Sequence, residues 1–189
     1  NRSYAINTTD LSLGKPNEVL FYRTQGAMST GPTVIGPYVY VPCRDRNLYC
    51  LNRRDMGKVW QYPSGHLLDA PAYPITDPAT NRTTVILPCG STGPLTGLSD
   101  TDGAVRWELA NAGSVVARFT EPENEPEKRC IMAVLNKDHT LSGHYVSNGA
   151  EIWRTDMSGF DLLITNTSDE FAYGAIADKT ILCALAKKN

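Results

Sequence analysis

The chain has 189 residues, of which 41% are hydrophobic and 20% are charged, and its formal net charge is −2. This length suits one domain or one small array of repeats, and the composition is typical of a folded globular protein rather than a disordered chain. The small net charge argues against a basic surface for nucleic acid or anionic lipid, and no apolar run approaches the roughly 18 residues of a membrane-spanning helix.

The predicted elements are short β-strands joined by polar turns. In chain order, residues 1–24 form part of a unit, and complete or nearly complete units follow at residues 27–62, 67–109, 114–155 and 160–186. Each of these units begins with a weak β-like run, and a strongly apolar run such as residues 38–41 or 130–135 comes next. A polar turn then leads to a second apolar block, so the two runs are expected to form a hairpin. No segment has helical periodicity over a helical length.

The repeat is marked by Trp60, Trp107 and Trp153, which lie 47 and 46 residues apart, each shortly after a glycine turn. An apolar block ends nine residues before each tryptophan, and a fourth copy stands near the C-terminus. The third position of the block is always a small residue. These residues are Cys50, Gly97, Gly143 and Ala184. In the partial first unit, Phe21 takes the position of the tryptophan.

Each unit therefore reads as four short antiparallel strands, called A to D here, with the tryptophan on strand D. A four-stranded unit that repeats every 40–50 residues is typical of a β-propeller blade. A tryptophan is large enough to fill the wedge between two blades, and a small residue beside it leaves room for the ring. The sequence thus predicts a single all-β propeller domain of about four blades.

Two arrangements of the blades are open. In one, the strand around residues 19–22 completes the last blade and closes a four-bladed ring, which removes the exposed sheet edges. In the other, the chain is a segment of a larger propeller with a half-blade at each end. Residues 3–6 repeat a strand C that the last blade already has, which favours the segment.

Residues 38–52, followed by Gly57-Lys58-Val59-Trp60, resemble the PQQ-like (quinoprotein-type) propeller repeat, whose blades read L-Y-A-L-D and then G-K-x-x-W. The resemblance extends at repeat level over nearly the whole chain. One branch of this family contains PQQ-dependent alcohol and glucose dehydrogenases, with the cofactor and Ca²⁺ near the propeller axis. The other branch is non-catalytic and includes outer-membrane assembly lipoproteins of the BamB type, sensor domains and propellers appended to larger proteins.

The dehydrogenase branch implies a pair of adjacent cysteines, about eight blades and a defined set of metal ligands. None of these can be matched here, so we expect no cofactor, no metal and no catalytic residue. The five cysteines are not adjacent to one another, and their odd number leaves at least one unpaired within a monomer. Their pairing is open, and they are Cys43, Cys50, Cys89, Cys130 and Cys183.

Two further groups of residues could suggest a metal. Asp100-Thr101-Asp102-Gly103 resembles the start of a calcium loop, but it falls where the other blades have a turn, and Asp and Gly are typical turn residues. The three histidines have no spacing that matches a compact metal motif. They are His66, His139 and His144.

The turns divide between two faces, because A–B and C–D turns emerge at one end of the blades and B–C and D–A turns at the other. Asn7, Asn81 and Asn166 begin glycosylation sequons and are expected on the first face. The second face is then the freer docking surface. Its candidate partner-binding residues are Arg44, Arg46, Lys137, His139 and Lys179.

The leading functional hypothesis is a non-enzymatic module that binds a protein or glycan partner through its blade loops. A part of a PQQ-dependent dehydrogenase, or a regulatory propeller appended to a larger enzyme or sensor, remains the alternative. The sequons favour an extracellular or periplasmic location, and a cytosolic location stays open.

Overall fold

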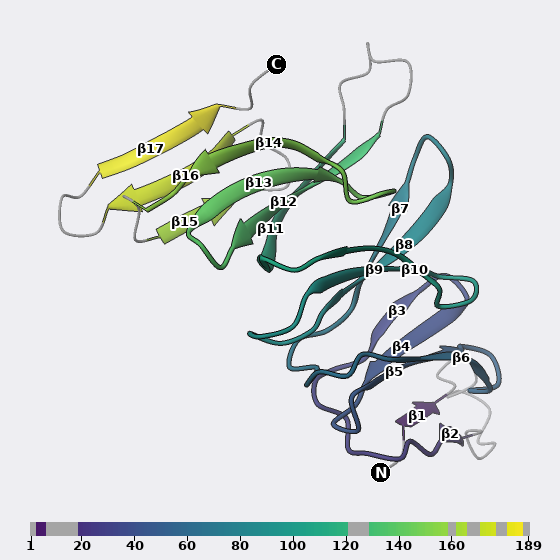
Figure 1. The fold of residues 1–189 in the computed structure, drawn as a ribbon. Helices are drawn as coiled ribbons and strands as arrows, with labels where there is room; N and C mark the ends of the chain where they lie inside the picture. The colour runs from purple at the N-terminus through teal and green to yellow at the C-terminus, as the bar shows by residue number, and fades with distance from the viewer. Residues whose placement is uncertain are drawn as a thin grey trace, which may run out of the picture.

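The computed structural model describes residues 3–6, 19–120, 129–158, 162–165, 171–176 and 181–186. The described residues form β-strands and turns, with no helix among them and so none that could span a membrane. Figure 1 shows the sheets following one another in a curved row from the N-terminus to the C-terminus. The all-β fold of four-stranded antiparallel blades that the sequence predicts is confirmed.

Three blades have all four strands, each paired in chain order. Blade 1 consists of β3 (Thr33–Ile35), β4 (Tyr38–Pro42), β5 (Asn47–Asn52) and β6 (Lys58–Pro63). Blade 2 consists of β7 (Tyr73–Asp77), β8 (Arg82–Pro88), β9 (Leu95–Ser99) and β10 (Val105–Leu109). Blade 3 consists of β11 (Ala112–Thr120), β12 (Cys130–Asn136), β13 (Thr140–Tyr145) and β14 (Glu151–Asp156).

The two ends of the row carry smaller sheets. At the N-terminal end β1 (Ser3–Ile6) pairs with β2 (Val19–Tyr22). At the C-terminal end β15 (Leu162–Thr165), β16 (Phe171–Ile176) and β17 (Ile181–Ala186) form a three-stranded sheet. The closed four-bladed ring would require β2 to pair with β17, and no such pairing exists among the described residues. In Figure 1, β1 and β17 also lie at opposite ends of the row, which is the open arrangement.

The hydrophobic core lies mainly between neighbouring blades. Trp60 and Tyr40 of blade 1 share one buried cluster with Val85 and Leu98 of blade 2. Trp107 of blade 2 shares a second cluster with strand β12 and the C–D turn of blade 3. The exposed fraction is only 6% for Trp60 and 7% for Trp107. Apolar burial, worth about 25 cal/mol per Å², therefore holds blade to blade.

Each buried indole also makes a hydrogen bond across the blade junction. The Trp60 Nε1–H donates to the Asp100 carbonyl at 2.8 Å, and the Trp107 Nε1–H donates to the Val146 carbonyl at 2.9 Å. Both carbonyls belong to the C–D turn of the next blade, at corresponding positions. The same turn therefore receives the same ring at both junctions.

A glycine lies under each of these two rings. Gly103 and Gly149 both have φ of +72°, a left-handed conformation that side chains rarely adopt. A Cβ atom on Gly103 would lie 2.7 Å from Cε3 of Trp60, and one on Gly149 would lie 2.8 Å from Cγ of Trp107. Backbone conformation and ring contact thus both require glycine at these positions.

The small-residue column lies directly opposite the tryptophans in the sheets. The register pairs Cys50 with Trp60, Gly97 with Trp107 and Gly143 with Trp153. A Cβ atom on Gly97 or Gly143 would meet the indole of the paired tryptophan. In β17, the backbone of Ala184 pairs with Tyr173, and the side chains of this strand lie outside the described part of the structure.

Trp153 is half-buried against Ala117, Leu141 and Met157 of its own blade. Its buried Nε1 has no hydrogen-bond partner among the described residues. The acceptor for Trp107 is the carbonyl of Val146, which lies three residues after Gly143, the small residue of the next blade. The same spacing after Ala184 gives residue 187 as the matching position for Trp153, and this residue lies outside the described residues.

The prediction that Phe21 takes the tryptophan position is wrong. In β2 it is Leu20 that pairs with Ala5, the small residue, whereas Phe21 pairs with Tyr4 and is 52% exposed. Leu20 and Tyr22 pack against the buried cluster of blade 1. Because side chains alternate between the faces of a strand, a one-residue error in register exchanges the inner and outer faces.

The first glycine turn also differs from the predicted pattern. The left-handed residue there is Met56, with φ of 56°, and not Gly57. The Met56 N–H donates to the Asn52 carbonyl at 2.8 Å, as the Gly103 N–H donates to the Ser99 carbonyl at 3.0 Å. The preceding unit offers Leu20 in place of a tryptophan, so a side chain fits, and Met56 is buried to 3% exposure.

Strand A of blade 2 begins later than the sequence predicts. The weak β-like run expected at the start of this unit consists of residues 70–73. It lies mostly in the loop before β7, and the strand itself is Tyr73–Asp77. Ala72 is buried although it stands in the loop, which explains why the apolar pattern suggested a strand there.

Replacing Gly149 by alanine tests the glycine under the ring. We expect Gly149→Ala to lower the free energy of unfolding by about 2–4 kcal/mol, because the new Cβ meets Trp107 and the backbone is left-handed. Gly31→Ala is the matched control, since nothing lies within 4 Å of a Cβ atom there. Urea unfolding followed by tryptophan fluorescence measures both, and equal costs for the two variants would contradict the packing described.

Candidate functional site

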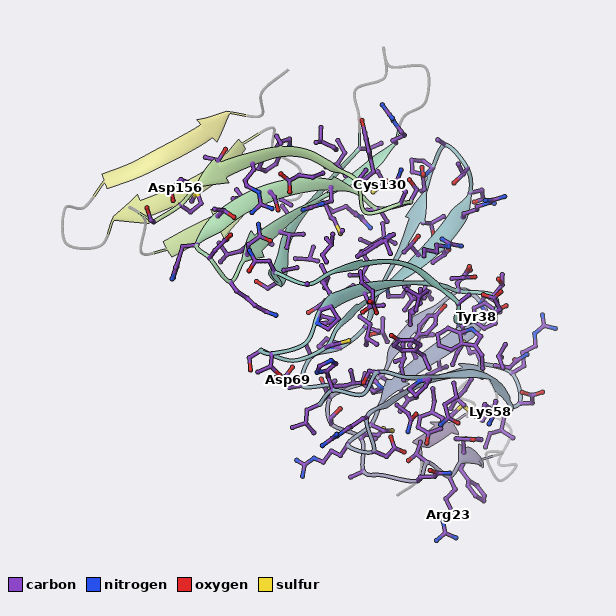
Figure 2. All side chains as sticks on the ribbon, in the orientation of Figure 1. Arg23, Tyr38, Lys58, Asp69, Cys130 and Asp156 are labelled. Atoms are coloured by element: carbon purple, nitrogen blue, oxygen red, sulfur yellow. The ribbon has the colours of Figure 1, made fainter. Side chains whose placement is uncertain are left out.

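The B–C turns and D–A loops lie at one end of the blades, and we call this end the basic-turn face. In Figure 2, Asp69, which follows strand D of blade 1, and Asp156, which ends strand D of blade 3, lie on one side of the view. Tyr38, which begins strand B of blade 1, and Lys58, which begins strand D of the same blade, lie on the other side. The described residues of the predicted docking surface are on the basic-turn face; Lys179 lies outside the described residues.

The B–C turn of blade 1 holds Arg46 in a left-handed conformation, with φ of 64°. The Arg46 N–H donates to the Cys43 carbonyl at 3.1 Å, and the Arg46 carbonyl accepts from the Ser64 N–H at 2.9 Å. Asp45 Oδ1 accepts from the Asn47 N–H at 3.1 Å. These hydrogen bonds fix the backbone of the turn around Arg46.

The B–C turn of blade 3 is built in the same way around His139, whose φ is 60°. The His139 N–H donates to the Asn136 carbonyl at 3.2 Å, and the His139 carbonyl accepts from the Met157 N–H at 2.8 Å. Asp138 Oδ1 accepts from the Thr140 N–H at 3.1 Å. Glycine adopts a positive φ at the lowest free-energy cost, yet both turns have a residue with a basic side chain at this position.

The aspartates of the two turns are anchored by further hydrogen bonds. Asp45 Oδ2 accepts from the Tyr49 hydroxyl at 2.6 Å, and burial together with this hydrogen bond raises the pKa of Tyr49 to about 12. The Thr140 hydroxyl donates to Asp138 at 2.7 Å and is the main cause that lowers the pKa of Asp138. Asp138 thus stays ionised near neutral pH, and each aspartate holds its turn in shape.

Lys137 and Arg44 occupy matching places in the two turns but behave differently. The Lys137 ammonium donates to the Gly93 carbonyl at 2.6 Å and to the Ala110 carbonyl at 3.2 Å. It therefore ties the B–C turn of blade 2 to the D–A turn that begins blade 3. The Arg44 side chain is exposed, so of this pair only Arg44 has its whole charged group available to a partner.

A cleft of about 390 Å³ opens on the same face where blade 2 meets blade 3. Its lining comes from the loop before β7 and from the turns and strand ends of blades 2 and 3, and it includes the glycines Gly90 and Gly113. The polar and aromatic lining residues are Asp69, Tyr73, Ser91, Ser114 and Lys137. Sequence reasoning found only Lys137, because the others are isolated residues with no motif among them.

The opposite face carries the only sequon asparagine that the structure describes, Asn81. It lies exposed in the turn between β7 and β8, with φ of 52°. Asn7 and Asn166 lie outside the described residues.

The remaining chemical candidates are engaged in structure. Asp100-Thr101-Asp102-Gly103 forms the C–D turn that receives Trp60. His144 is buried, with Nε2 2.8 Å from the Ser142 hydroxyl and Nδ1 3.0 Å from the Gly149 carbonyl. Within the described ranges, no three His, Cys, Asp or Glu side chains are grouped as metal ligands.

The four described cysteines are free, buried thiols, and Cys183 lies outside the described residues. Burial raises the pKa of each thiol, to about 12 for Cys50 and about 11 for Cys43 and Cys130. A raised pKa keeps the thiol protonated and poorly reactive at neutral pH, so these cysteines act as small apolar core residues.

Comparisons with known proteins place the fold. No protein-family model matches the sequence, and no curated protein matches it significantly. Among solved structures, BamB from Moraxella catarrhalis is 18% identical with a TM-score of 0.56, over 82% of this chain and 46% of that chain. A europium-containing methanol dehydrogenase is 12% identical with a TM-score of 0.60, over 98% of this chain and 47% of that chain. The computationally designed protein Ika4 is 8% identical with a TM-score of 0.52, over 87% and 93% of the two chains.

The chain thus spans about half the length of the BamB and methanol dehydrogenase structures that it matches. Together with the blades, these likenesses confirm the β-propeller fold. BamB and a methanol dehydrogenase are also the kinds of protein that the sequence resemblance names for its two branches. At these low identities the likeness concerns the fold and carries no function across.

Replacing Lys137 by methionine tests its structural role. Lys137→Met removes two charge-assisted hydrogen bonds at the junction of blades 2 and 3, so we expect the free energy of unfolding to fall by about 1–2 kcal/mol. Arg44→Met, at the matching place in blade 1, is expected to change it by less than about 0.5 kcal/mol. Chemical unfolding of the two variants measures the difference; a larger loss for Arg44→Met would refute the assignment.

Proposed function

We propose that this chain is a non-enzymatic propeller module that binds a protein partner through its basic-turn face. The observation that carries the proposal is the pair of matching turns that hold Arg46 and His139 in left-handed conformations. A residue with a side chain costs about 1–2 kcal/mol more than glycine in this conformation, so each basic side chain stands there at a cost to stability. Residues in strained backbone conformations cluster at binding and catalytic sites.

The chemistry of the face favours an acidic partner. Arg44, Arg46 and His139 stand on turns whose backbones are already fixed by hydrogen bonds. A partner therefore meets the guanidinium groups of Arg44 and Arg46 on a rigid support, and little ordering entropy is lost from these turns on binding. Complementary charge of this kind raises the association rate and selects the partner more than it raises affinity.

The opposite face supports a second part of the proposal. Asn81 is exposed in its turn and begins a sequon, and we propose that it carries a glycan together with Asn7 and Asn166 in an extracellular or periplasmic setting. Glycans on the A–B and C–D face would leave the basic-turn face as the docking side. Peptide mapping of the protein from its native source tests this, and unmodified asparagines at all three sites would count against it.

A part of a PQQ-dependent dehydrogenase is the second candidate, and the likeness to methanol dehydrogenase over 98% of this chain favours it. Addition of PQQ with Ca²⁺, followed by an assay for dye-linked alcohol oxidation, separates the two functions. Turnover would support the dehydrogenase, and an inactive protein that still captures its partner would support the binding module.

The test of the basic-turn face is a double charge reversal, Arg44→Glu with Arg46→Glu. Like-charge contact with an acidic partner opposes binding, so we expect affinity for a glutamate-rich probe peptide and capture of the native partner to fall on the order of tenfold or more. Fluorescence anisotropy at two salt concentrations measures the peptide affinity, which should also weaken as salt rises.

Arg53→Glu with Arg54→Glu is the matched control, because these exposed arginines lie in the C–D turn on the other face and the change in charge is identical. Unfolding curves of both double variants check that the fold is kept. Equal loss of binding in the control, or unchanged binding in the Arg44 and Arg46 variant, would refute the assignment of the face.

A further inference from the structure

The partner binding proposed for Arg44, Arg46 and His139 does not use the cleft on the basic-turn face. The residues that line the cleft suit a different kind of ligand. The cleft volume of about 390 Å³ falls within the roughly 300–1,000 Å³ of small-molecule sites. It lies between the loop before β7, the B–C turn of blade 2 and the start of β11. Asp69 marks its place in Figure 2, on the side of the molecule away from Tyr38 and Lys58.

Asp69 supplies a carboxylate that makes no hydrogen bond or ion pair with another described residue. It lies beside Gly90, where a Cβ atom would be 3.9 Å from both carboxylate oxygens. Gly90 has φ of +67°, and the same Cβ would be 2.8 Å from the Leu67 carbonyl, so a side chain is disfavoured at this position of the lining. At Gly90 the cleft is therefore lined by backbone next to a charged acceptor.

Lys137 supplies the opposite charge on the cleft wall. Two of its three N–H groups are used by the Gly93 and Ala110 carbonyls, which leaves one donor for a ligand. Lys137 forms no ion pair with Asp69. The cleft thus offers a fixed ammonium and a separate carboxylate whose formal charges cancel.

An exposed aromatic ring completes the lining. Tyr73, at the start of β7, is 43% exposed, whereas Ile75 on the same face of the strand is buried. The hydroxyl-bearing Ser91 and Ser114 line the same cleft, together with the apolar Pro88 and Val115. Tyrosine binds apolar faces of ligands with its ring while its hydroxyl stays in water.

From this combination we propose that the cleft is a subsite for a neutral saccharide of one or two sugar units. Sugar hydroxyls donate to the Asp69 carboxylate and accept from the Lys137 ammonium, and the apolar C–H face of the ring packs on Tyr73. A ligand with a net charge is attracted by one of these two groups and repelled by the other, so the cleft gives neither an anion nor a cation a net electrostatic advantage over a neutral ligand. The subsite is independent of the partner proposed for the basic turns.

The experiment is saturation-transfer difference NMR on the full chain with a panel of small probes. The neutral probes are methyl α-mannoside, methyl β-glucoside and N-acetylglucosamine, and the charged probes are glucuronate and Nα-acetyl-lysine methylamide. We expect at least one neutral probe to bind with a dissociation constant in the millimolar range, with weaker signals from both charged probes.

Three variants tie the signal to the cleft. Asp69→Asn and Tyr73→Ala are each expected to weaken sugar binding about tenfold, because they remove a charged acceptor and the ring. Tyr73→Phe keeps the ring and is expected to retain most of the binding, and Arg44→Glu with Arg46→Glu leaves it unchanged. Unfolding midpoints check that each variant is folded.

The outcomes are distinct. A useful subsite requires a dissociation constant below about 10 mM. The absence of binding by every neutral probe at about this concentration would overturn the proposal. So would preference for the lysine or glucuronate probe, or sugar binding that survives both Asp69→Asn and Tyr73→Ala.

Discussion

The indole of one blade lodged in the C–D turn of the next is the interaction on which the rest of the structure depends. Each blade is a thin sheet whose apolar residues cannot be covered within the blade itself. Trp60 and Trp107 cover them by filling the junction, and each adds a hydrogen bond to a backbone carbonyl of the next blade. The glycines beneath the rings follow from this contact, since the ring occupies the space that a side chain would need.

The functional proposals rest on the same constraint. The basic turns of blades 1 and 3 are useful to a partner only if the blades hold them in a fixed arrangement, and the cleft exists only where blade 2 meets blade 3. Lys137 contributes to both, because its ammonium bridges the two blades and also lines the cleft. Binding on this face therefore depends on the tryptophan junctions behind it.

The sequence predicts the features that repeat and misses those that do not. The spacing of the tryptophans and the small residues opposite them is enough to predict the blades, because three copies reveal a shared packing requirement. The sequence misplaces Phe21 because an isolated strand gives no register, and Leu20 and Phe21 are both apolar. It does not predict the left-handed Met56, because the glycine rule fails where no tryptophan lies over the turn. Asp69, Tyr73 and Ser91 come together only through the packing of separate segments, which a sequence pattern does not record.

A double-mutant cycle between Trp60→Leu and Gly103→Ala tests the junction most directly, because the two residues lie in different blades. A Cβ atom added at Gly103 would lie 2.7 Å from Cε3 of Trp60, and leucine at position 60 removes that ring atom. Gly103→Ala should therefore cost less in the Trp60→Leu background than in the parent protein, with a coupling free energy of about 1 kcal/mol or more. Costs that add to within about 0.5 kcal/mol would mean that the two side chains do not meet, and the wedge between blades would be contradicted.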